Sequence, residues 1–133
     1  MNTTPQFEPP ILFLLFNRPE LTKNVFERIR LIRPRQLFVA ADGPRQGSDS
    51  DFRNCAAARL ITQNIDWQCD VKYRFLEKNY GCRRAVSGAV SWFFNQVSEG
   101  IILEDDCLPS VDFFYFCSAA LEKYRNAEKD NAH

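Results

Sequence analysis

An uninterrupted run of six apolar residues, Ile11 to Phe16, is the feature that most constrains how this chain folds. The run ends abruptly at Asn17-Arg18-Pro19. A strand with one face in water alternates polar and apolar residues, whereas a strand buried on both faces of a parallel sheet is continuously apolar. The run therefore predicts an inner strand of a parallel sheet that has helices on both faces.

The rest of the chain alternates between helical and extended periodicity. Apolar residues at helical spacing predict four helices, over residues 19–33, 52–65, 85–97 and 110–124. Short apolar or alternating runs predict three further strands, over residues 37–41, 71–75 and 101–103. The predicted buried helix faces include Phe52, Phe113 and Tyr124. This order predicts an α/β fold, a three-layer α-β-α domain with a mostly parallel sheet. We expect a flexible lead-in over residues 1–10, the domain over 11–126 and a tail over 127–133.

The composition excludes several classes of partner. Seventeen basic residues balance seventeen acidic ones, so no overall field attracts nucleic acid or an anionic membrane. No apolar run approaches the ~20 residues of a membrane helix, and no signal-peptide pattern opens the chain. We therefore expect a cytoplasmic protein without an integral membrane segment.

The cysteines and the single histidine argue against two further kinds of site. The five cysteines form no C-x-x-C pair, and the single histidine is the last residue, His133. Zinc binding and a Ser-His-Asp or Cys-His catalytic set are therefore not expected. The sequence also has no G-x-G-x-x-G or P-loop pattern, so the usual dinucleotide and kinase sites are absent from it.

Three consecutive carboxylates, Glu104, Asp105 and Asp106, follow the fourth predicted strand. Ligands of open α/β sheets bind at the carboxyl ends of the strands, which is where these acids are expected to lie. Their mutual repulsion is relieved by a cation, and hard oxygen ligands suit Mg²⁺ or Mn²⁺ bridging to a diphosphate. The alternative is a solvated acidic turn that caps the following helix.

Three other residues at strand ends are candidates for ligand binding. Asp42 follows the second strand and can accept a hydrogen bond from a base or a ribose, although Asp-Gly is also a common turn. Arg18 follows the first strand and can contact a phosphate or a base, or else be a solvated loop residue. Arg83 opens the helix after Gly81, a suitable position for an anion ligand.

Taken together, three segments resemble the GT-A glycosyltransferases, nucleotide-diphospho-sugar transferases related to family 2. Residues 10–19 resemble the family's first strand and nucleotide loop, and Ala41-Asp42-Gly43 resembles its base-binding aspartate. Residues 101–106 resemble its DxD-type motif, in the form found in N-acetylglucosaminyltransferase I. The resemblance covers residues 10–124 and implies a GT-A fold.

The resemblance also implies residue roles. Asp42 would contact the base, Arg18 would hold the base or the diphosphate, and Asp106 would ligate Mn²⁺ or Mg²⁺. Glu104 and Asp105 would face ribose and donor-sugar hydroxyls, and Arg83 would be a further donor-site residue. Uridine is the usual nucleotide of such enzymes, so the implied donor is a UDP-sugar, while the acceptor is unknown.

The family's catalytic domain continues beyond this point to the acceptor site and, in inverting enzymes, the carboxylate that deprotonates the acceptor. We therefore expect this chain to be truncated and to lack the acceptor site and the catalytic base. One alternative is a non-catalytic remnant that binds the nucleotide and transfers nothing. Another is a phosphoryl-transfer or receiver-type domain that binds magnesium through Asp105 and Asp106, although such folds usually place these acids after the first strand.

Overall fold

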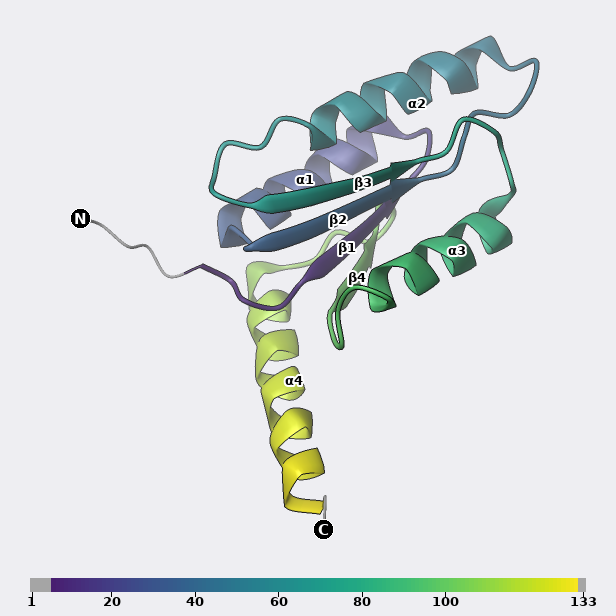
Figure 1. Cartoon of the computed structure of the whole chain (residues 1–133). Coiled ribbons are helices and arrows are strands. Elements are labelled where there is room, and N and C mark those ends of the chain that lie inside the picture. Colours follow the sequence, from purple (N-terminus) through teal and green to yellow (C-terminus); the bar gives the residue numbers. More distant parts are fainter. Residues whose placement is uncertain (1–5, 132–133) are drawn as a thin grey trace.

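The computed structural model describes residues 6–131 and alternates strand and helix four times (Figure 1). The α/β fold with a parallel sheet that the sequence predicts is confirmed. Its elements are β1 (Ile11–Leu15), α1 (Pro19–Ile32), β2 (Gln36–Ala41), α2 (Asp49–Thr62), β3 (Asp70–Phe75), α3 (Cys82–Phe94), β4 (Ile101–Glu104) and α4 (Val111–Asn131).

The four strands form one all-parallel sheet in the order β3-β2-β1-β4. β1 pairs with β2 on one side and with β4 on the other; Leu12 lies opposite Phe38 and Ile102. Its residues Ile11, Leu12 and Phe13 are fully buried, as the apolar run predicts. The chain moves outward from β1 to β3 and then returns to β4 beside β1. This reversal places α1 and α2 on one face of the sheet and α3 on the other (Figure 1).

Alternate residues of the strands enter two separate cores. Phe13, Leu15 and Val39 belong to the larger core, which α1, α2 and the start of α4 complete. Leu12 and Leu14 belong to the smaller core, which α3 closes with Ala89 and Phe93. Each fully buried large apolar side chain contributes about 1.5–3 kcal/mol relative to exposure, so both layers stabilise the sheet that carries the strand ends.

The packed structure begins before β1. Phe7 is 6% exposed, its N–H donates to the Arg33 carbonyl at 3.3 Å, and its carbonyl accepts from the Arg35 N–H at 3.0 Å. Phe7 also packs edge-on against Phe114 of α4. Residues 6–10 therefore form part of the packed structure, although the sequence predicts a flexible lead-in there; residues 1–5 lie outside the described range.

Two predicted buried helix faces are wrong in part. Phe52 is 68% exposed, because the buried stripe of α2 starts one residue earlier, at Asp51. In α4 the buried aromatic residue is Phe114, whereas Phe113 and Tyr124 are exposed. Four consecutive aromatic residues at 113–116 fit two helical stripes equally well, and only contact with α1 and Phe7 selects one of them.

Helix α4 also extends further than predicted. It continues to Asn131 and leaves the body of the domain after its first turns (Figure 1), so most of the predicted tail over 127–133 is helical; residues 132–133 lie outside the described range. Exposed helical turns carry no apolar stripe, so the apolar periodicity of the sequence does not predict this last part of α4. Across residues 6–131, no helix combines the length and apolar composition required to cross a bilayer.

Candidate functional site

Two adjoining cavities lie at the carboxyl ends of the strands. One has a volume of about 270 Å³ and the other about 410 Å³. Their shared lining consists of Leu14, Leu15, Phe16, Arg45, Cys82 and Val86. The connections from β1 to β2 and from β3 to β4 pass over opposite faces of the sheet, so the loops separate at the end of β1. This reversal point is where open α/β sheets bind their ligands.

The larger cavity brings together four of the predicted site residues. Arg18 lines it from the loop after β1, and Glu104, Asp105 and Asp106 line it from the end of β4. The β1–β4 pairing is the cause, because it continues past the strands through a hydrogen bond from the Asp105 N–H to the Leu14 carbonyl at 3.2 Å. The Arg18 guanidinium and the three carboxylates, which lie far from Arg18 in the sequence, therefore line the same cavity.

The three carboxylates differ in environment. Glu104 and Asp106 are exposed, whereas Asp105 is half-buried. Burial raises the pKa of the Asp105 carboxyl, and the negative charge of Asp106 raises it further, against the opposing effect of Arg18. A positive ion in this cavity would therefore stabilise the ionised form of Asp105.

The acidic residues fit an open metal site and not a closed protein cage. Within residues 6–131 no group of three histidine, cysteine, aspartate or glutamate side chains converges as a preformed metal site. Mg²⁺ commonly takes one or two protein carboxylates and completes its shell with waters and phosphate oxygens. The exposed carboxylates of Glu104 and Asp106 suit that kind of coordination, with Asp105 behind them.

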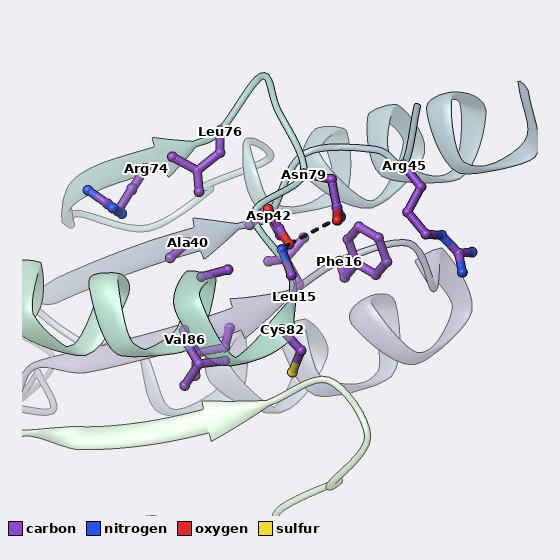
Figure 2. A pocket seen from close by; sticks show the side chains of 14 residues that line it. Leu15, Phe16, Ala40, Asp42, Arg45, Arg74, Leu76, Asn79, Cys82 and Val86 are labelled. Atoms are coloured by element: carbon purple, nitrogen blue, oxygen red, sulfur yellow. Dashed lines mark hydrogen bonds between the residues drawn. The ribbon is translucent and has the colours of Figure 1, made fainter. Parts of the chain in front are cut away.

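Asp42 lines the smaller cavity, and its carboxylate is already engaged by the protein (Figure 2). One oxygen accepts from the N–H groups of Gly43 at 2.8 Å and Tyr80 at 2.9 Å. The other accepts from the Gly81 N–H at 3.0 Å and the Asn79 amide at 3.2 Å. A carboxylate offers about four acceptor sites, so these four donors occupy it fully. Asp42 thereby joins the end of β2 to the turn before α3.

The same two loops approach closely at Gly43. A Cβ at this position would lie 2.5 Å from the carbonyl carbon and oxygen of Lys78. Only glycine permits this backbone contact without displacement. The Asp42-Gly43 pair, which the sequence offers as either a turn or a ligand contact, therefore fixes one loop against the other.

A buried aspartate that the sequence analysis did not identify organises the other rim. Asp51 is 2% exposed and accepts from Arg45 through Nε at 2.5 Å and Nη2 at 2.8 Å. The Asn17 amide donates to the same carboxylate at 2.8 Å. These hydrogen bonds hold the pKa of Asp51 well below its usual range. Asp51 thus ties the loop after β1 to the loop after β2, and it orients Arg45 along both cavities.

Arg74 is a second residue that the sequence analysis did not single out. It lines the smaller cavity from β3, at the opposite end from Arg45 (Figure 2). Its Nε is buried and has no hydrogen-bond partner in the part of the chain that the structure describes. Lys72 and Arg74 alternate with apolar residues in the sequence, a signal that could have placed both on one face of β3. Arg83, by contrast, is exposed in the first turn of α3 and is not among the lining residues of either cavity.

Comparison of the chain with protein-family models, with curated proteins and with solved structures gave no match. The interpretation of the site therefore depends on its own geometry and chemistry.

Proposed function

We propose that the chain is the donor-binding part of a GT-A type glycosyltransferase, and that it binds a nucleotide-diphospho-sugar through Mn²⁺ or Mg²⁺. The observation that carries this proposal is the larger cavity, in which Arg18 faces Glu104, Asp105 and Asp106. A cavity lined by both carboxylates and a guanidinium suits a diphosphate that shares a divalent cation with the protein.

The two cavities suit different parts of such a ligand. The smaller one, of about 270 Å³, is lined largely by aliphatic residues and is near the lower limit of roughly 300 Å³ for ligand pockets, which suits a flat heterocycle. The larger one takes the diphosphate and the sugar. Since the Asp42 carboxylate is occupied by four protein donors, we assign it to holding the turn at 79–81 instead of contacting the base.

Under this proposal the residues promote displacement at the anomeric carbon of the sugar. The leaving group is a nucleoside diphosphate, on which negative charge develops as the bond breaks. Arg18 would stabilise that charge, and Asp106 and Glu104 would hold a divalent cation, which would supply Lewis-acid stabilisation when bound. The base that accepts the proton of the acceptor hydroxyl is not assigned to a residue.

Calorimetric titration of UDP and UDP-sugars, with and without Mn²⁺, tests the proposal. We expect binding that requires Mn²⁺ and that falls at least about tenfold in Asp106→Ala, since a lost charged contact costs ~1.5–3 kcal/mol. Asp112→Ala is the matched control, because Asp112 is an exposed aspartate outside both cavities. Absence of binding, or binding indifferent to both Mn²⁺ and Asp106, would refute the proposal. Binding without sugar transfer to any acceptor would identify a non-catalytic nucleotide-binding remnant.

A further inference from the structure

The polar side chains around the smaller cavity differ in what they can still bind. Asp42 has no free acceptor site, and the Arg45 guanidinium is already paired with Asp51. Asn79 uses its amide nitrogen on Asp42 and on the Gly43 carbonyl, so its oxygen remains as an acceptor at that end of the cavity. The side chain of Arg74, at the other end, makes no hydrogen bond or ion pair within residues 6–131. The Arg74 end of the cavity therefore offers side-chain donors only.

We infer that Arg74 selects the nucleobase by the group at position 4 of a pyrimidine or position 6 of a purine, and that the smaller cavity prefers uracil and guanine, which carry a keto oxygen there, over cytosine and adenine, which carry an amino group there. This inference depends on the proposed function, because it assigns the base of the bound nucleotide to this cavity.

The position of Arg74 is fixed by the sheet. Arg74 lies opposite Ala40 in the β2–β3 register, on the face of the sheet that α3 covers. Its partner on β2, Ala40, carries only a methyl group, which leaves room for a flat ring above β2. A heterocycle in this space would lie between the aliphatic surface of Leu14 and Ala40 and the side of α3.

Gly88 of α3 makes space for the guanidinium. A Cβ added at Gly88 would lie 2.9 Å from Nη2 of Arg74 and 3.7 Å from its Cζ. The side chain is therefore held between β3 and α3, which reduces the entropy lost when it forms a hydrogen bond with a ligand. Nε of this guanidinium is buried, whereas Nη1 and Nη2 are not among the buried unpaired atoms and make no hydrogen bond within residues 6–131, so they are the donors that a ligand oxygen can reach.

The chemistry of the bases then sets the preference. A keto oxygen, O4 of uracil or O6 of guanine, accepts from the guanidinium. The corresponding amino group of cytosine or adenine is a donor, which would face another donor and leave both unpaired. Sites that hydrogen-bond a ligand group discriminate strongly against an analogue that lacks it, because their buried polar groups are then left unsatisfied.

The test is titration of UDP, CDP, GDP and ADP in Mn²⁺ at one fixed ionic strength. For the unaltered chain we expect UDP to bind at least about tenfold more tightly than CDP, and GDP than ADP, as for one charge-assisted hydrogen bond. In Arg74→Met both ratios should fall below about threefold while the affinity for pyrophosphate is unchanged. Arg74→Lys, which keeps a donor, should retain part of the preference.

Two further variants separate recognition from folding. Gly88→Ala should reduce the preference by displacing Nη2, although alanine favours the helix. Lys72→Met changes a cation on the same strand that is not in the cavity lining, and should leave both ratios unchanged. Equal affinity for the four nucleotides, or a preference that survives in Arg74→Met, overturns this inference and leaves the proposed function standing. If none of the four binds, both are overturned.

Discussion

Replacing Asp42 with asparagine tests whether this carboxylate holds the turn before α3. Asparagine is nearly isosteric and supplies one acceptor oxygen where aspartate supplies two. Two of the four donors now on Asp42 would therefore face an amide NH₂ group: either Gly43 and Tyr80, or Gly81 and Asn79. Since Asp42 is only 8% exposed, water cannot replace the lost acceptor fully.

The expected loss of stability follows from those two bonds. A hydrogen bond to a charged group contributes ~1.5–3 kcal/mol, and the lower value applies because Tyr80 and Asn79 are exposed and can bond to water. Two bonds give about 3 kcal/mol, within the 5–15 kcal/mol stability typical of a domain, so the variant should still fold. With a urea m-value of about 1.5 kcal/mol per M, the midpoint of unfolding should fall by about 2 M.

Urea unfolding followed by circular dichroism measures this shift. Glu77→Gln is the control, because Glu77 is an exposed acid in the same loop with no hydrogen bond to its side chain in the described residues; its effect should stay within about 0.5 kcal/mol. A shift in Asp42→Asn as small as that of the control would refute the reasoning. The carboxylate would then be free to contact a base, and Asp42→Asn would weaken the binding of some nucleotides far more than others.

Two predictions concern pH. The pKa of Asp51 is lowered by hydrogen bonds from Arg45 and Asn17, so its stabilisation is complete above the unfolded value near ~3.9 and is lost as the pH falls towards the folded value. Asp51→Asn should therefore cost about 2 kcal/mol at neutral pH, with a difference from the unaltered chain that narrows below about pH 4 in thermal melts; a constant difference would contradict this. The pKa of Asp105 is raised mainly by burial, so its ionised form destabilises the fold at pH values above the folded pKa. Asp105→Asn should raise stability at pH 7 and have little effect below about pH 4, and a variant less stable than the unaltered chain at pH 7 would show that Asp105 is stabilising.

The fold was largely predictable because its strongest signal is local. Ile11–Leu15 is buried on both faces, and a strand in that position has no polar side chain that could interrupt the run. Because predicted strands and helices alternate along the chain, the sheet is expected to be parallel. Ligands of such sheets bind at the carboxyl ends of the strands, which selects the loops that form the site. This reasoning correctly placed Arg18 in the same region as Asp105 and Asp106, although 87 residues separate Arg18 from Asp105.

The rest of the site depends on contacts that local patterns do not contain. Asp51 meets Asn17 across 34 residues and Asp42 meets Gly81 across 39, so their roles follow from which loops the sheet brings together. Asp51 and Asp105 are both aspartates near strand or helix ends, yet their pKa values move in opposite directions. Hydrogen bonds from Arg45 and Asn17 to Asp51, and partial burial of Asp105, cause that difference, and neither is visible in sequence.

The hydrogen-bonding state of each polar group separates residues that build the site from residues that remain available to a ligand. Asp42, after β2, and Asp51, in the first turn of α2, are buried acids that donors from neighbouring loops engage. Arg74 is different, because it lines a cavity and its guanidinium makes no hydrogen bond within the described chain. Stability should therefore respond most to the two acids and base preference to the arginine. If Arg74→Met unfolded the protein while Asp42→Asn left its stability unchanged, this assignment would be reversed.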